Sequence, residues 1–276
     1  MPEPVITLND LLRSSAFAVE HRPGIGWPSD TDPSQIDMYT IKQIYQYAET
    51  ARRYLVTSGV QLIAPQESSV IGLFGFPANI EYVVTIFALM GLGYTVFVIS
   101  PRMQASALGT LLEKTGCRFV FYSPTTSEIA HEVGAERQMK LVPFLSLADL
   151  GETTTTDAQT PDQDITESNK TALIWHSSGP TGLPKLFPMT HRQMLVRSRL
   201  NLYTDDRLFI NSPLYASAGI SFLLFNMHKT APTLFWNENL PYTSNNLTLA
   251  LESFRPKYIS ISPYALKCFA ETEQGV

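Results

Sequence analysis

The sequence predicts an α/β fold with mostly parallel sheets and helices on both faces. Short runs of β-branched and aromatic residues alternate with helix-like segments from residue 70 onward, which is typical of such sheets. Hydrophobic residues make up 44% of the chain and charged residues 16%, as expected for a globular protein. The 276 residues can bury a sizeable core as one large domain or two small ones.

The first unit of the predicted sheet runs from residue 70 to residue 99. Val70–Phe74 has the composition of a buried strand, and residues 75–79 form a turn in which Asn79 can cap the next helix. Residues 80–90 are apolar on nearly all faces, which predicts a buried helix. The next strand is expected at residues 94–99, so that strand, helix and strand form a βαβ unit.

The same alternation continues along the chain. Gly116 stands where a glycine often ends a helix, and Thr190 with Gln193 has the spacing of a capping box at a helix start. The expected strands are 118–122, 140–142, 171–175, 208–210, 233–236 and 258–261. The expected helices are 105–115, 127–136, 190–200, 220–228, 246–254 and 264–271.

Two stretches depart from this alternation. Residues 82–99 carry no charge and approach the ~20 residues that a membrane span needs. Gly91 and Gly93 interrupt the stretch before a β-branched run, which favours a buried helix followed by a buried strand over a span. Residues 151–169 are rich in Thr, Asp, Gln and Pro, and predict a surface linker within the domain.

Charge and cysteine content exclude several classes of protein. The formal net charge is -5 and no run of Lys and Arg occurs, so nucleic-acid binding is not expected. Cys117 and Cys268 are too far apart for a disulfide framework or a metal-ligand spacing, which favours buried thiols in a reducing compartment. The first 22 residues contain no continuous apolar segment of a signal peptide. These features predict a cytoplasmic protein without a membrane partner.

The most informative segment for function is residues 176–185, between a predicted strand and a capped helix. Its glycines allow the backbone to approach a ligand, and its hydroxyls and lysine suit a polyphosphate. The candidate phosphate-binding residues are Ser177, Ser178, Gly179, Thr181, Gly182 and Lys185. Composition alone leaves an ordinary Ser/Gly turn equally open.

Two better-known nucleotide motifs do not fit. A Walker A loop places its lysine directly after a glycine, whereas Leu183 and Pro184 separate Lys185 from Gly182. A nicotinamide-dependent Rossmann enzyme is a further hypothesis, but residues 24–26 lack the third glycine and the preceding strand of its fingerprint.

Residues 177–185 closely resemble the phosphate loop of the adenylate-forming superfamily, which contains acyl-CoA synthetases, luciferases and peptide-synthetase adenylation domains. Residues 39–41 with Ile44 and Ala48 resemble its first helix entry. Other similar stretches are 88–94, 100–102, and 213–215 with Gly219. The likeness runs from about residue 39 to residue 270, and looks closest to fungal peptide-synthetase-like enzymes and adenylate-forming carboxylate reductases. Pro180 and Leu186 depart from the usual loop residues.

The resemblance implies ATP-dependent activation of a carboxylic acid as an acyl-adenylate. In that family the loop contacts the β- and γ-phosphates of ATP, Mg²⁺ assists, and a thiol of CoA or of a carrier domain's phosphopantetheine takes the acyl group. The Mg²⁺ carboxylate motif, the ribose-binding Thr-Gly-Asp motif and the C-terminal lid with its lysine do not occur in this sequence.

Residues 1–276 are therefore expected to form an incomplete N-terminal portion of the adenylate-forming fold, a partial AMP-binding domain without its lid. No catalytic residue and no metal ligand is assigned within the chain, and the chain is not expected to form adenylate alone. Whether it acts as a ligase stays open, because a non-catalytic remnant that at most binds phosphate-bearing ligands is the alternative.

One stretch bears on the identity of the acid. Amino-acid-activating relatives use an aspartate to pair the substrate ammonium, whereas residues 207–237 contain no Asp or Glu at all. The candidate pocket residues are Tyr215, Gly219 and Phe222, and they favour an aryl or other non-amino acid. Two alternatives remain: another region supplies the charge, or Tyr215 and Phe222 are plain core residues.

Overall fold

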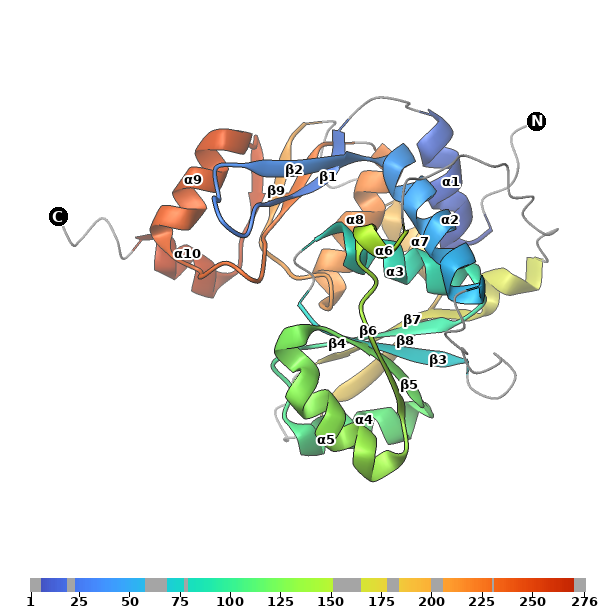
Figure 1. The fold of residues 1–276 in the computed structure, drawn as a ribbon. Helices are drawn as coiled ribbons and strands as arrows, with labels where there is room; N and C mark the ends of the chain where they lie inside the picture. The colour runs from blue at the N-terminus through green and yellow to red at the C-terminus, as the bar shows by residue number, and fades with distance from the viewer. Residues whose placement is uncertain are drawn as a thin grey trace.

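The computed structural model describes residues 6–18, 23–57, 69–76, 79–150, 165–177, 184–199, 206–229 and 231–270. The described residues form two sheets, A and B, packed with helices (Figure 1). Sheet A has the order β11-β9-β10-β1-β2, with bounds Tyr258–Ser260, Leu208–Ile210, Thr233–Phe235, Pro23–Pro28 and Ile36–Thr40. Sheet B has the order β6-β5-β3-β4-β7-β8, with bounds Lys140–Pro143, Phe119–Tyr122, Val70–Phe74, Thr95–Ile99, Thr171–Ser177 and Lys185–Thr190.

Both sheets are parallel except at one edge. The pairs β1–β2 and β7–β8 are antiparallel, and all the other strand pairs are parallel among the described residues. The predicted α/β class with mostly parallel sheets is therefore confirmed.

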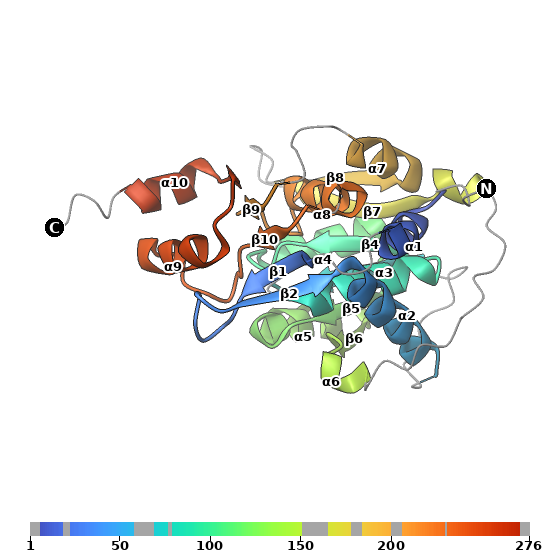
Figure 2. The ribbon, with the colours of Figure 1, turned by 90° about the horizontal axis from the view of Figure 1, so that it is seen from above.

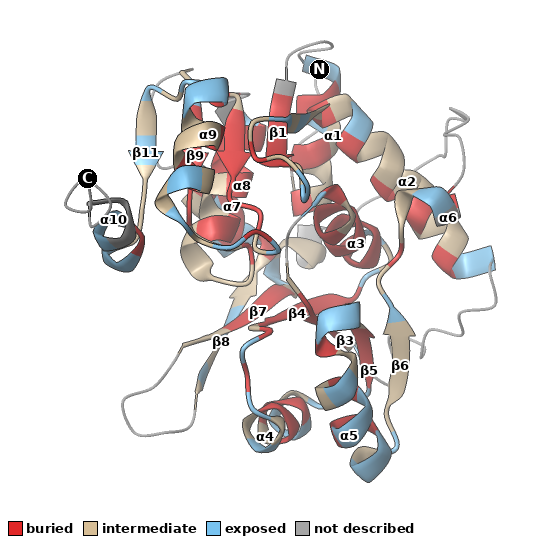
Figure 3. Ribbon diagram, turned by 60° about the vertical axis from the view of Figure 1, so that its left-hand side comes forward, coloured by how far each residue is buried: buried red, intermediate tan, exposed pale blue. Residues whose placement is uncertain are grey.

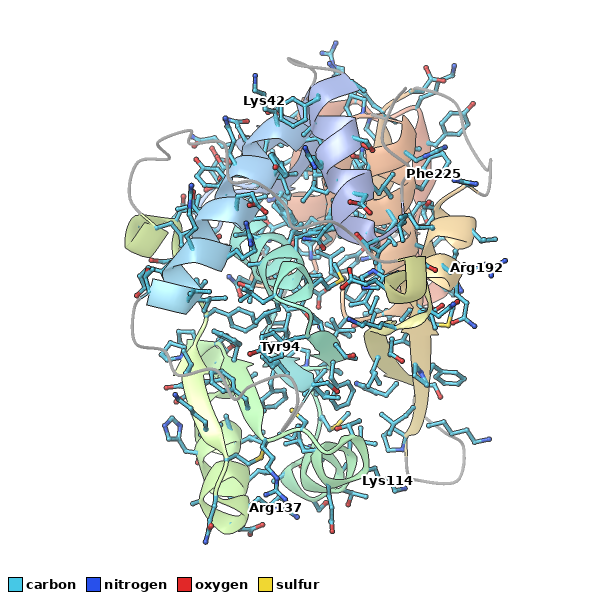
Figure 4. The ribbon with its side chains drawn as sticks, turned by 90° about the vertical axis from the view of Figure 1, so that its right-hand side faces the viewer. Lys42, Tyr94, Lys114, Arg137, Arg192 and Phe225 are labelled. Carbon is cyan, nitrogen blue, oxygen red and sulfur yellow. The ribbon has the colours of Figure 1, made fainter. Side chains whose placement is uncertain are left out.

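Helices lie between the sheets and outside them (Figures 1 and 2). The inner group is α1 (Leu8–Ala18), α2 (Ile41–Thr57), α3 (Ile80–Gly91), α7 (His191–Ser198) and α8 (Ser217–Lys229). The outer helices of sheet B are α4 (Ala105–Thr115) and α5 (Ser127–Arg137), and those beside sheet A are α9 (Ser244–Phe254) and α10 (Pro263–Ala270). The short helices are α6 (Leu147–Leu150), η1 (Pro124–Thr126) and η2 (Ile165–Asn169). In Figure 4, Phe225 marks α8 in the upper part, while Lys114 and Arg137 mark α4 and α5 below.

The central strands β3, β4 and β5 of sheet B are apolar on both faces because helices cover both. In β4, Val96 and Val98 belong to the core between the sheets, whereas Phe97 and Ile99 pack in the cluster beneath α4 and α5. Successive side chains of a strand point to opposite faces, so a strand covered on both sides must be apolar throughout. The unbroken apolar runs of the sequence follow from this arrangement.

Helix α3 is the centre of the molecule. All residues from 82 to 90 are buried, so its surface is apolar on every side (Figure 3). Gly93, with φ +85°, ends the helix region and lets β4 begin at Thr95. The stretch that resembled a membrane span is thus a buried helix followed by a buried strand. Within the described residues, no helix has the length and apolar character to cross a membrane.

Most expected elements are present with small shifts of their ends. The left-handed Gly116 cap and the Thr190–Gln193 capping box are also found as predicted. Asn79 occupies the N-cap position of α3 but makes no side-chain capping hydrogen bond. Cys117 is a buried free thiol, and burial raises its pKa to about 12.

Strand β8 corrects the expected path from the loop to the helix. A loop was predicted to lead to a helix at Thr190, but residues 185–190 form an antiparallel strand before α7 begins at His191. Pro188 argues against a strand when the sequence is considered alone, because proline has no N–H to donate. A proline is compatible with β8 because β8 lies at the edge of sheet B, where a missing N–H can face away from the neighbouring strand.

The predicted linker at 151–169 lies mostly outside the described residues. Its last five residues form the 3₁₀ helix η2 instead of irregular chain. Sequence patterns also gave no prediction for α1, β1 and β2. These elements precede the first regular βαβ unit. Strand β1 pairs with β10, and α1 and β1 contact α8, so both depend on residues much later in the chain.

Candidate functional site at the carboxyl ends of the two sheets

The β7–β8 hairpin holds the two ends of the predicted phosphate loop. Ser177 ends β7 and Lys185 begins β8, and their Cα atoms are direct partners in the antiparallel register. Directly opposite residues in such a pair have side chains on the same face, with Cβ atoms about 4.5–5.5 Å apart. By alternation this is the face of Trp175, which packs in the core between the sheets. The side chains of Ser177 and Lys185 therefore start from neighbouring positions at the carboxyl end of β7.

The other predicted loop residues fall outside the described part of the chain. These are Ser178, Gly179, Thr181 and Gly182, together with the departure at Pro180. The second departure, Leu186, is described: it packs partly against the cluster beneath α4 and α5. Its apolar side chain therefore contributes to the core of sheet B.

His176 ties the base of the hairpin to the end of β4. Its Nε2 atom accepts a hydrogen bond from the backbone N–H of Ser100 at 3.0 Å, and its ring lies edge-on to Phe97. Burial lowers the pKa of His176, so the ring is neutral and its proton is assigned to Nδ1. That buried Nδ1 atom has no hydrogen-bond partner among the described residues.

Arg102 links the carboxyl ends of the two sheets. It follows β4 of sheet B, and its Nη1 atom donates to Tyr215 Oη at 2.7 Å. Its Nη2 atom lies 2.9 Å from Glu238 Oε2, just after β10 of sheet A. The guanidinium also lies 5.6 Å from the ring centre of Phe76, after β3. One arginine thus connects loops that follow β3, β4, β9 and β10.

The electrostatics of this bridge depend on burial. The Glu238 side chain is only 8% exposed, whereas that of Arg102 is 64% exposed. Burial raises the pKa of Glu238, and Arg102 opposes that rise. Burial, with the nearby Glu238 charge, raises the pKa of Tyr215 to about 12. Tyr215 is therefore a neutral phenol and Glu238 a buried carboxylate whose partner is Arg102.

The three candidate pocket residues are placed on or beside helix α8. Tyr215 precedes the helix, and Phe222 packs partly against the core between the sheets. Gly219 is buried, and a Cβ atom there would lie 2.2 Å from the carbonyl oxygen of Pro213. This glycine is required by the close approach of α8 to the preceding loop.

A second polar contact lies between the hairpin and α8. Arg197 of α7 lies 5.8 Å from the ring centre of Trp175, and its Nε atom donates to Ser221 Oγ at 2.6 Å. The hairpin is thereby connected to α8 through α7.

The structure places these residues in one region. Ser177, Lys185 and Tyr215 all lie at the carboxyl ends of parallel strands, where ligands of open α/β sheets usually bind. Sequence reasoning assigned no role to Arg102, Glu238 or His176. Arg102 and His176 stood within the quoted segments, but the pairing of Arg102 with Glu238 joins residues 136 positions apart and leaves no local sequence pattern. Among the described residues, no group of three or more His, Cys, Asp or Glu is placed to hold a metal ion.

A family model described as AMP-binding enzyme matches residues 30–275. The chain belongs to the AMP-binding enzyme family. The match includes sheet B with the β7–β8 hairpin, the Arg102 bridge, and every strand of sheet A except β1.

Curated relatives of this AMP-binding chain are fungal enzymes. It is 31% identical over 169 residues to the non-ribosomal peptide synthetase ascB of Acremonium egyptiacum, covering 57% of the chain and 15% of the relative. It is 28% identical over 206 residues to an adenylate-forming reductase of Aspergillus terreus, covering 69% of the chain and 19% of the relative. The chain thus spans less than a fifth of the length of these two relatives.

Solved structures of the same architecture confirm the fold. A long-chain-fatty-acid-CoA ligase from Archaeoglobus fulgidus matches with a TM-score of 0.80 at 17% identity, covering 100% of this chain and 55% of that protein. A luciferase-like enzyme from Zophobas morio matches with a TM-score of 0.78 at 15% identity, covering 96% of this chain and 61% of that protein. The AMP-binding chain therefore has the arrangement of part of the adenylate-forming fold.

Proposed function

We propose that the chain binds the β- and γ-phosphates of ATP at the β7–β8 hairpin during activation of a carboxylic acid as an acyl-adenylate. The observation that carries this proposal is the direct cross-strand pairing of Ser177 with Lys185 at the carboxyl end of β7. A lysine ammonium and hydroxyls at a glycine-containing turn suit a polyphosphate, since each charge-assisted hydrogen bond is stronger than a neutral one. Lys185 is exposed and thus accessible to a ligand.

The residues present fit the phosphate part of ATP. The two ends of the hairpin carry a hydroxyl at Ser177 and a cation at Lys185, on directly opposite positions of β7 and β8. ATP would supply the phosphoanhydride whose cleavage drives activation, and the chain's contribution would be to position its outer phosphates. Mg²⁺ would reduce the phosphate charge, with its protein carboxylate supplied outside the residues of this chain.

We propose a non-amino acid, such as an aryl acid, as the substrate. The first acidic residue after the acid-free stretch is Glu238, and its carboxylate already pairs with Arg102. A substrate ammonium near Tyr215 would therefore find no free carboxylate there, and an unpaired buried ammonium is costly. A phosphopantetheine or CoA thiol would accept the acyl group, on a carrier domain in the first case. The buried free thiol of Cys117 supports a cytoplasmic setting.

Binding of pyrophosphate tests the phosphate assignment directly. Replacement of Lys185 with Ala removes a charge-assisted contact worth about 1.5–3 kcal/mol, so the Kd for pyrophosphate should rise roughly tenfold or more. Titration calorimetry of the chain measures this change. Lys114→Ala, on the outer helix α4, is the matched control and should leave the Kd unchanged. Equal Kd values for the wild type and Lys185→Ala would refute the assignment.

A substrate panel tests the acid. In a longer protein that carries this chain with a complete adenylating site, pyrophosphate exchange should be faster with aryl or aliphatic acids than with α-amino acids. Fastest exchange with an amino acid would overturn the substrate proposal but leave the phosphate proposal intact. Absence of exchange with any acid, together with intact pyrophosphate binding, would favour the non-catalytic alternative.

A further inference from the structure

The loop that carries Arg102 lies between the phosphate hairpin and the candidate acid pocket. Two residues before Arg102, the backbone N–H of Ser100 donates to His176 Nε2 at 3.0 Å, at the base of the hairpin. On its other side, the Nη1 atom of Arg102 donates to Tyr215 Oη at 2.7 Å. In the proposed reaction, the carboxylate of the acid must lie between the body of the acid and the phosphates. The Arg102 loop occupies that position in the sheet junction.

Three contacts fix the orientation of the Arg102 guanidinium. Tyr215 accepts a hydrogen bond from Nη1, and the carboxylate of Glu238 lies 2.9 Å from Nη2. The guanidinium also lies 5.6 Å from the ring centre of Phe76. An unrestrained surface arginine loses side-chain entropy when it binds a ligand. Because these contacts already restrict Arg102 in the free chain, it is preorganised for binding.

The same contacts leave part of the guanidinium open to a ligand. An arginine carries five N–H donors in a planar fork. The bonds to Tyr215 and Glu238 use one N–H on each terminal nitrogen, so the other N–H groups lie outside these two bonds. The Arg102 side chain is 64% exposed, whereas that of Glu238 is 8% exposed. A second carboxylate can therefore reach the cation from solvent without displacing Glu238.

The charges of the reactants call for a cation at this position. The carboxylate of an acid and the phosphates of ATP repel each other, because like charges at short range are unfavourable inside a protein. A guanidinium offsets this repulsion and matches a carboxylate with two parallel hydrogen bonds. Lys185 is assigned to the outer phosphates, so the carboxylate needs a separate cation. The neighbouring Tyr215 is a neutral phenol and does not repel an anion.

We propose that Arg102 binds the carboxylate group of the acid substrate. The guanidinium would donate to this carboxylate through N–H groups that Tyr215 and Glu238 do not use, and the body of the acid would extend toward Tyr215. Glu238 would orient Arg102 and would also compete with the acid for its charge. This inference rests on the proposed function, because it takes a carboxylic acid as the substrate, but it does not depend on which acid is activated.

Two probes of similar size and shape test the charge preference. Benzoate is an aryl carboxylate, and benzamide is its neutral counterpart. Ligand-observed NMR titration of the chain without nucleotide should give a Kd for benzoate that is about threefold to tenfold lower than that for benzamide. Equal Kd values for the two probes would overturn the proposal, as would absence of benzoate binding.

Substitutions at Arg102 and Glu238 should change benzoate binding in opposite directions. Arg102→Gln removes the cation, so the Kd for benzoate should rise about threefold to tenfold. Glu238→Gln removes the competing carboxylate but retains an oxygen for Arg102, so the Kd should fall. A purely structural role of the bridge predicts a rise of the Kd in both variants, and that result would refute the proposal.

A double variant keeps the test valid if Arg102→Gln alone unfolds the chain. The single substitution leaves the buried Glu238 carboxylate without its partner, which is costly. Arg102→Gln combined with Glu238→Gln removes both charges, and its Kd for benzoate should equal that for benzamide. Arg118→Gln, before β5 at the opposite end of the parallel strands, is the control and should leave the benzoate Kd unchanged. Benzoate binding that persists in the double variant would refute the site.

Pyrophosphate binding separates this inference from the proposed function. A wild-type chain that binds pyrophosphate but not benzoate would overturn the role of Arg102 and leave the phosphate assignment intact. A wild-type chain that binds benzoate through Arg102 but not pyrophosphate would overturn the hairpin assignment and leave Arg102 as the carboxylate site.

Discussion

His191 is the first residue of α7, and its buried side chain connects this helix to the start of α1. Its Nδ1 atom accepts a hydrogen bond from the backbone N–H of Leu8 at 3.2 Å. The backbone N–H of His191 donates to the backbone carbonyl of Lys170. The side chain is 7% exposed. Glu167, Asp10 and Lys170 are the charged groups that influence it, but burial has the largest effect and lowers its pKa to about 4.

This lowered pKa predicts a loss of stability in mild acid. Between the ordinary histidine pKa of 6.5 and the folded value of about 4, the unfolded chain binds a proton that the folded chain does not. The contribution of His191 to stability is therefore complete above pH 6.5 and decreases as the pH falls toward 4, by up to roughly 3 kcal/mol. Urea unfolding at a series of pH values measures this slope.

The variant His191→Asn isolates the effect of the histidine. An asparagine side-chain oxygen can accept the Leu8 N–H but does not titrate, so the slope of stability against pH between 6.5 and 4 should become shallower. An unchanged slope in His191→Asn would contradict the assignment of the pH dependence to this residue.

At the scale of elements, local patterns predicted those helices and strands whose neighbours cover them uniformly. Helix α3 and strand β4 are buried on all sides, so their apolar runs are unmistakable. The edge strand β8 was missed because its solvent-facing residues and Pro188 remove the alternation that marks a strand. The candidate site followed the same rule: the contiguous loop was recognised, whereas the Arg102–Glu238 pair depends on how two sheets meet.

The junction between β8 and α7 yields a prediction at this scale. Thr190 Oγ1 accepts from the Gln193 N–H, and Gln193 Oε1 accepts from the Thr190 N–H. Thr190→Ala should lower the free energy of unfolding by about 1 kcal/mol, as is typical for loss of an N-cap. Because α7 follows the phosphate hairpin directly, the same change should also weaken pyrophosphate binding by a few-fold.

Thr243→Ala is the matched control for this prediction. Thr243 caps α9 through an equivalent hydrogen bond from the Asn246 N–H, far along the chain from the hairpin. Its loss should cost similar stability without an effect on pyrophosphate. Equal effects of the two substitutions on the pyrophosphate Kd, measured by calorimetry, would show that the α7 cap does not support the hairpin.

At the scale of the whole molecule, the most exposed apolar side chains of the C-terminal region gather on β11 and α10. Ile259 is 50% exposed, Leu266 is 55% exposed and Tyr264 is 72% exposed. Strand β11 is also an edge of sheet A, where among the described strands it pairs only with β9. An edge strand with exposed apolar residues is prone to pair with another copy.

Self-association of the chain should therefore depend on this edge. A lysine at an edge strand opposes pairing with a second strand, so Ile259→Lys should shift the chain toward monomer by a clear margin in sedimentation velocity at several concentrations. Val56→Lys is the control, because Val56 is 67% exposed on α2, away from the edge. Identical sedimentation of wild type and Ile259→Lys would exclude the β11 edge as the contact.

The pairing of β1 with β10 has a consequence for how the chain matures on the ribosome. Ile25 of β1 lies against Thr233 of β10, so the centre of sheet A joins segments that are synthesised far apart in time. At ~5–20 residues per second, roughly 10–40 s separate their translation. Sheet B, by contrast, is built from residues 70–190 and can assemble in that interval. The β1–β2 ribbon therefore stays without its β10 partner until residue 233 is synthesised, with Ile25 and Trp27 uncovered. We expect a chaperone to bind the nascent chain at this segment.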